Sequence, residues 1–83
     1  MRVDKFLNSV NITKRRAVSE DMCKSGVVSI NGKIAKPAKE VKIGDTIEIK
    51  YLDKTEVYEV LKIPITKSIP KSKKDEYVRI KNV

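Results

Sequence analysis

Histidine is absent from this sequence of 83 residues, and cysteine occurs only once, at position 23. A single cysteine excludes a disulfide within the chain, and without histidine an ordinary zinc site is difficult to assemble. Because Cys23 falls within a helical pattern, we expect a small buried core residue rather than a reactive thiol. The sequence also lacks a histidine base, a glycine-rich phosphate loop and paired carboxylates. It therefore predicts no enzyme, no metal site and no cofactor.

Aromatic residues and long apolar runs are also scarce. Aromatics make up 5% of the residues, which is too few for an aromatic-lined ligand pocket. No apolar run approaches the roughly 20 residues that a membrane span needs, and the N-terminus lacks the apolar region of a signal peptide. We therefore expect a cytoplasmic protein without a membrane partner.

Positive charge is what the sequence has in excess. Lysine and arginine number 19 against 11 acidic residues, giving a formal charge of +8 and a pI near 9.7. Such a balance indicates a polyanionic partner only if the cations are grouped. The length predicts a single domain over 1–83, and the pattern of its residues predicts a motif core at 1–50 and a strand-rich tail at 51–83.

The first half of the chain predicts two short helices. Val3, Phe6, Leu7 and Val10 share one face of a helix that ends near residue 11. Thr13 is a suitable N-cap for a second helix, and Gly26 is a suitable residue to end it. The predicted buried arc of this second helix consists of Val18, Ser19, Met22 and Cys23. The carboxylates Asp4, Glu20, Asp21 and Asp45 are expected to be ordinary first-turn, solvent-face and turn residues.

The second half predicts strands. Val28 and Ile30 alternate with Ser29, and Asn31-Gly32 then indicates a type I′ hairpin in which Ile30 pairs with Lys33. Further strands are expected over 46–51, 56–63 and 77–81. The composition of 64–76, rich in lysine, proline and serine, predicts a flexible loop whose lysines are ordinary solvated side chains.

Basic residues gather where the two helices are expected to meet. Lys14, Arg15 and Arg16 fall in the expected first turn of the second helix, where cations cost a few tenths of a kcal/mol each. A negative partner outside the chain would offset this cost, and N–H groups at a helix start bind phosphate. The residues predicted to bind phosphates of a polyanionic partner are Arg2, Lys5, Lys14, Arg15, Arg16, Lys33 and Lys36.

Four motifs in order carry a resemblance to a known family: MRVDKFL at 1–7, KRR at 14–16, GVVSING at 26–32 and VKIGD at 41–45 followed by Ile47. Over roughly residues 1–50 the chain resembles the RNA-binding domain named after ribosomal small-subunit protein S4. The resemblance implies an α+β fold, a two-helix hairpin packed on a small, mostly antiparallel curved sheet of about four to five strands. It also implies that Arg16 belongs to the family's signature.

Within that family, the chain is similar to free-standing bacterial factors of ribosome-associated quality control and to the fifteen-kilodalton heat-shock protein. This similarity implies binding to large-subunit rRNA and to tRNA on obstructed large ribosomal subunits that carry peptidyl-tRNA. It also implies an RqcH-type protein on the same particle and a role in alanine tailing, and we expect a monomer. Two alternatives stay open: a ribosome-assembly or large-subunit recycling factor, and a regulatory module that binds a protein through its sheet.

Overall fold

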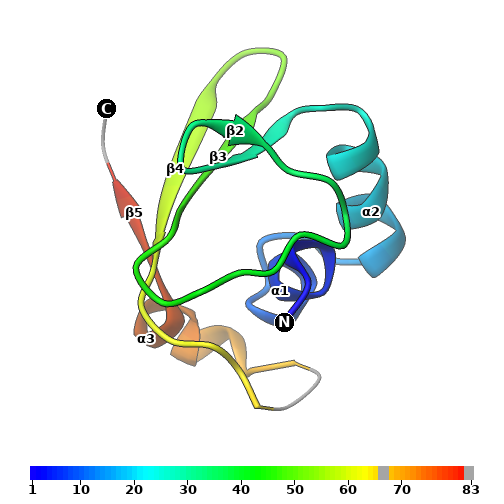
Figure 1. Cartoon of the computed structure of the whole chain (residues 1–83). Coiled ribbons are helices and arrows are strands. Elements are labelled where there is room, and N and C mark those ends of the chain that lie inside the picture. Colours follow the sequence, from blue (N-terminus) through cyan, green and yellow to red (C-terminus); the bar gives the residue numbers. More distant parts are fainter. Residues whose placement is uncertain (66–67, 82–83) are drawn as a thin grey trace.

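The computed structural model describes residues 1–65 and 68–81 (Figure 1). Two helices come first and four strands follow. A 3-10 turn and a short helix then precede the fifth strand. The elements are α1 (Val3–Ser9), α2 (Arg16–Lys24), β1 (Val28–Ile30), β2 (Lys33–Ile34), β3 (Thr46–Lys50), β4 (Thr55–Val60), η1 (Lys71–Lys73), α3 (Lys74–Tyr77) and β5 (Val78–Lys81). Across the described ranges, no helix has the length and apolar character that crossing a bilayer requires.

The five strands form one sheet in the order β2-β1-β3-β4-β5, and every neighbouring pair is antiparallel. The predicted hairpin is confirmed, because Ile30 pairs with Lys33. Both residues of its turn have positive φ, 52° for Asn31 and 84° for Gly32, as a type I′ turn requires. The α+β prediction, with about four to five strands, is confirmed.

α1 supplies several core residues, and Figure 1 shows it beside α2 against one side of the sheet. Its predicted apolar face is confirmed, since Val3, Phe6, Leu7 and Val10 are all fully buried. They belong to one cluster with Val28, Ile47 and Ile49 of the sheet. Burying a side chain of this size contributes about 1.5–3 kcal/mol, so α1 is strongly held in place.

The start of α2 differs from the prediction. Thr13 is not the N-cap: Arg15 takes that position with extended backbone, and no side chain caps the helix. The Thr13 hydroxyl is engaged elsewhere, because it donates to the Arg15 carbonyl and shares a hydrogen bond with Ser19. Only Arg16 therefore lies within the helix, while Lys14 precedes it.

The buried stripe of α2 is narrower than predicted. Ser19 and Cys23 are buried and Met22 is half-buried, but Val18 is 46% exposed. Positions four residues apart lie above one another on a helix, so Ser19 and Cys23 alone form the line of closest approach to the core. Val18 lies beside that line, in the first turn of a helix that starts later than expected.

The expected loop at 64–76 contains regular structure instead. η1 and α3 occupy its second half, and Ile69 is buried. The Ile69 N–H donates to the Ser9 carbonyl at 3.0 Å, and the Asn11 side-chain amide donates to the Ile69 carbonyl at 2.8 Å. Residues 66–67 of the predicted loop lie outside the described residues. The chain before η1 is thus fastened to the end of α1.

Candidate RNA interface

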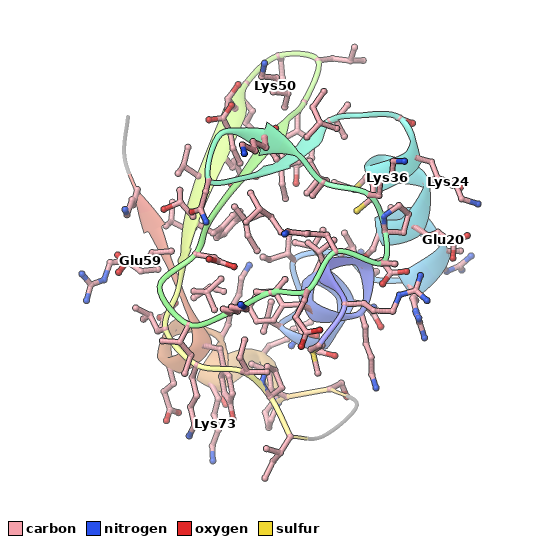
Figure 2. The ribbon with its side chains drawn as sticks, viewed as in Figure 1. Glu20, Lys24, Lys36, Lys50, Glu59 and Lys73 are labelled. Carbon is pink, nitrogen blue, oxygen red and sulfur yellow. The ribbon has the colours of Figure 1, made fainter. Side chains whose placement is uncertain are left out.

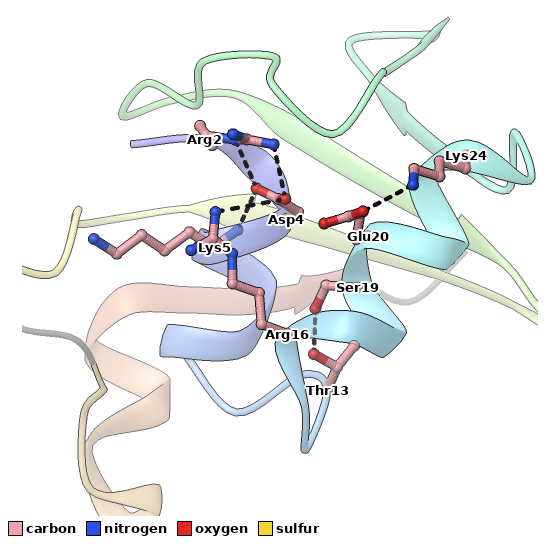
Figure 3. A network of polar contacts seen from close by, with 8 residues as sticks. All are labelled: Arg2, Asp4, Lys5, Thr13, Arg16, Ser19, Glu20 and Lys24. Carbon is pink, nitrogen blue, oxygen red and sulfur yellow. Dashed lines mark hydrogen bonds and ion pairs between the residues drawn. The ribbon is translucent and has the colours of Figure 1, made fainter.

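A buried carboxylate lies at the junction of α1 and α2 (Figure 3). Asp4 is fully buried, which corrects the expectation of an ordinary first-turn residue. Its Oδ1 accepts from Arg2 Nε at 3.2 Å and from the Lys5 backbone N–H at 2.8 Å, while its Oδ2 accepts from Arg2 Nη2 at 3.1 Å. Arg16 Nη2 of α2 lies 3.8 Å from the same Oδ2. Asp4 therefore joins Arg2, the N-cap residue of α1, to Arg16, the first residue of α2.

The two arginines are anchored on one side and accessible on the other. Their side chains are 48% exposed for Arg2 and 49% for Arg16, whereas that of Asp4 is 0% exposed. A guanidinium has five N–H donors, and the Asp4 carboxylate uses two of those of Arg2. The planar fork of arginine matches the oxygens of a phosphate. Arg2 is thus held by two hydrogen bonds and Arg16 by a longer ion pair, and both can still bind an anion.

Three further predicted cations are close to this pair in the sequence. Lys14 and Arg15 are exposed and Lys5 is half-buried. None of the three forms an ion pair with a carboxylate in the described part of the chain. Figure 3 shows the Lys5 side chain extending away from α2. These three cations therefore keep positive charge that no acidic side chain of the described residues offsets.

One acidic side chain borders the arginines. Glu20 accepts from Lys24 at 2.8 Å, one turn further along α2. That hydrogen bond and the Lys24 charge lower the pKa of Glu20, and Arg2 and Arg16 lower it further. Glu20 therefore stays ionised beside the arginines, and it marks the edge of the basic surface.

The loop after β2 brings Lys36 to the same region. The Lys39 carbonyl accepts from the Val3 N–H at 2.7 Å, and the Pro37 carbonyl accepts from the Asp4 N–H at 3.4 Å. Since Lys36 directly precedes Pro37, it lies beside the start of α1. Figure 2 shows it on the same side of the molecule as Glu20 and Lys24.

Lys33 is connected to this region less directly. It lines an open hollow of about 630 Å³ with Lys36, and no hydrogen bond or ion pair in the described residues ties it to α1 or α2. Sequence reasoning missed two other lysines that line the same hollow, Lys39 and Lys42. Their signal was weak, because they lie in an irregular segment whose path the sequence does not predict.

Sequence reasoning also missed the role of Asp4. Its place between core residues Val3 and Leu7 on the helix was the available signal, because a carboxylate beside a buried face needs cationic partners. Burial raises the pKa of the Cys23 thiol to about 11, and the negative charge of Asp4 contributes to that rise. Cys23 is buried, as predicted.

Metal chemistry has no candidate residues in the part of the chain described. Groups of three or more cysteine or acidic side chains that could hold an ion are absent from residues 1–65 and 68–81. What this region presents to a partner is therefore cationic side chains, with arginines fixed by a buried acid. Such a surface can bind phosphates without a cofactor.

Comparison with known proteins bears on this arrangement. Residues 1–47 match the model of the S4 domain family. A protein from Helicobacter pylori strain J99, named RQC P-site tRNA stabilizing factor, is 49% identical over 78 residues, or 94% of this chain and 93% of that relative.

Two solved structures are similar along almost the whole chain. Heat Shock Protein 15 of Vibrio cholerae superposes with a TM-score of 0.88 at 27% identity, covering 98% of this chain and 81% of that one. The hypothetical protein HP1423 gives a TM-score of 0.86 at 47% identity, covering 100% and 99%. The chain therefore belongs to the S4 domain family and, within it, to the RQC P-site tRNA stabilizing factors, also called RqcP.

Proposed function

We propose that this protein is a non-catalytic RNA-binding factor that holds tRNA on obstructed large ribosomal subunits carrying peptidyl-tRNA. The observation that supports this most is the buried Asp4, which fixes Arg2 and Arg16 across two helices while leaving each about half exposed. A fixed guanidinium loses less conformational freedom on binding a phosphate than a mobile one. The name of the relatives, which refers to stabilizing P-site tRNA, supports the choice of tRNA.

The proposed contacts follow the geometry of the surface. Arg2, Lys5, Lys14, Arg15 and Arg16 bind phosphates of tRNA or of large-subunit rRNA, and Lys33 and Lys36 extend the surface along the hollow. Neutralising about five to seven phosphates gives a slope of log affinity against log salt of roughly −4 to −6 on duplex-like RNA. A measured slope near zero would contradict this electrostatic mechanism.

The proposed setting is the bacterial cytoplasm. There the protein acts as a monomer beside an RqcH-type protein and supports the addition of alanine to the stalled chain. Family membership among the RQC P-site tRNA stabilizing factors supports the ribosomal setting, while the monomeric state, the RqcH-type partner and the alanine addition stay predictions. Its mechanism needs no group that the chain lacks, because holding an RNA in place requires only binding.

The test is to recover the protein from cells and to measure which ribosomal particle and which tRNA accompany it. We expect large subunits that carry tRNA, and we expect Arg15→Ala with Arg16→Ala to abolish the association. Lys50→Ala with Lys54→Ala is the matched control, because it removes the same charge from the exposed β3–β4 turn region.

Two outcomes would contradict the proposal. Recovery with tRNA-free precursors would favour an assembly or recycling factor. Intact ribosome binding by the double arginine variant would favour a module that binds a protein partner.

A further inference from the structure

Four lysines gather at the end of the molecule formed by η1 and α3. We call this group the lysine face; it consists of Lys62, Lys71, Lys73 and Lys74. Figure 2 shows Lys73 beyond α3, at a different side of the molecule from Glu20 and Lys24 of α2. The match to the S4 domain ends at residue 47, so the face lies outside the part that the family model describes.

The segment that carries the face is held by the fold. Ile69 is buried and exchanges hydrogen bonds with the end of α1, as described above. Immediately after it, the Lys73 N–H donates to the Pro70 carbonyl at 2.9 Å and closes the turn of η1. On the neighbouring chain, the N–H groups of Leu61 and Lys62 both donate to the Tyr77 carbonyl, at 2.7 and 3.2 Å. The backbone thus fixes where these lysines project.

Two of the ammonium groups also lie over aromatic rings. Lys62 Nζ is 5.3 Å from the centre of the Tyr77 ring, and Lys74 Nζ is 5.7 Å from that of Tyr58. A contact of this kind orients a cation and leaves its charge in place. It therefore holds the ammonium without satisfying its need for an anion.

Acidic partners do not neutralise the face. Elsewhere in the described chain Lys24 pairs with Glu20 and Lys81 pairs with Glu59. No carboxylate of the described residues lies within 4.0 Å of a lysine of the face, although Asp75 and Glu76 follow directly in α3. Like charges on adjacent turns repel one another, and a polyanion reduces that repulsion.

We propose that the lysine face is a second RNA-contacting surface, separate from the one around Arg2 and Arg16, so that the domain contacts RNA from two sides. The inference rests on the proposed function in taking RNA as the partner. Lysine is depleted at protein–protein interfaces and is a common ligand of phosphate, which favours an RNA backbone over an acidic protein. The ordered backbone distinguishes these lysines from the solvated loop side chains that the sequence predicts.

The test compares two double variants on one probe, a fluorescently labelled bacterial tRNA transcript, across a salt series. Lys71→Gln with Lys73→Gln removes two charges from the face, and Lys50→Gln with Lys54→Gln removes two from the opposite end, where Figure 2 shows Lys50. Losing two phosphate contacts reduces the steepness of the salt slope by about 1.4–1.8 and weakens binding about tenfold or more at 0.1 M salt. We expect this of the face variant only, with both variants melting at the wild-type temperature.

Two other results would contradict the proposal of a second RNA-contacting surface. Equal slopes and affinities for the two variants would overturn it, even though the wild type binds tRNA. A loss seen on intact large subunits but not on tRNA or naked ribosomal RNA would assign the face to an acidic ribosomal protein instead. If the proposed function were wrong, the result would differ from these outcomes, because the wild-type protein itself would not be recovered from cells with tRNA-bearing large subunits.

Discussion

Asp4→Asn is the substitution that separates fixed arginine geometry from simple charge attraction. The change keeps the size of the side chain but turns one carboxylate oxygen into an NH2 group. Both oxygens of Asp4 accept hydrogen bonds, Oδ1 from Arg2 and the Lys5 N–H, and Oδ2 from Arg2. An asparagine must therefore direct a donor toward another donor, and both arginines lose their buried counter-charge.

The expected cost in stability follows from the burial. Removing one partner of a fully buried ion pair costs about 3–5 kcal/mol, because the other charge is left without compensation. Here Asp4 is 0% exposed but Arg2 and Arg16 are about half exposed, so water can solvate the released guanidinium groups. We therefore expect the free energy of unfolding to fall by about 1–3 kcal/mol. Urea denaturation measures this as a lower midpoint with an unchanged m-value.

We expect Asp4→Asn to weaken RNA binding, whereas its change in charge alone would strengthen it. The variant is one unit more positive, so general attraction to a polyanion should rise. If the fixed arginines carry the contact, the tRNA affinity instead falls about 3- to 10-fold, because they must be ordered on binding. Fluorescence anisotropy at a fixed salt concentration measures this difference.

Asp21→Asn is the matched control. Asp21 lies exposed on α2, so its loss changes the net charge equally without touching the arginines. We expect it to bind tRNA slightly more tightly than the wild type and to unfold at the same urea concentration. The reasoning is refuted if Asp4→Asn binds tRNA as tightly as Asp21→Asn.

Three further predictions follow from the same structure. Arg16→Ala should weaken tRNA binding by about 1–3 kcal/mol, while its half-exposed ion pair with Asp4 contributes only about 0–1 kcal/mol to unfolding; a collapse in stability would make Arg16 a structural residue. Leu7→Ala should lower the free energy of unfolding by about 2–5 kcal/mol in urea, since the side chain is fully buried. Folding raises the pKa of the Cys23 thiol from 9.0 to about 11. Between these two pH values the folded protein keeps the thiol proton, whereas the unfolded chain releases it. Stability should therefore fall between about pH 9 and pH 11, and it should fall less steeply in Cys23→Ala.

Much of the fold follows from local patterns in the sequence. The apolar face of α1 and the Asn31-Gly32 turn depend on residues within seven positions of one another, and both are confirmed. The start of α2 could not be predicted in the same way. Thr13 has the residue type of an N-cap, but its hydroxyl is engaged by Ser19 and by the Arg15 carbonyl in the folded chain. These contacts are local too, within six positions, but residue type alone does not decide between the two uses of the side chain.

The candidate site, too, could be predicted from the sequence only in part. The cluster of Lys14, Arg15 and Arg16 is visible in the sequence, and its role in RNA binding stays a prediction. The burial of Asp4 was indicated only by its place between the core residues Val3 and Leu7, because its cationic partner Arg16 comes from α2. The chain just before the lysines of η1 is held by a hydrogen bond between Asn11 and Ile69, which lie 58 positions apart and which no local pattern predicts.

The fastening of Ile69 to the end of α1 affects how this domain can be transplanted. The part recognised as an S4 domain ends at residue 47, within β3, yet Tyr58, Val60, Ile69 and Val78 belong to the same core cluster. A fusion that borrows only residues 1–47 would leave one edge of β3 unpaired and one end of α1 uncovered. For protein engineering, the portable module is therefore larger than the recognisable motif, and grafts should extend through β5.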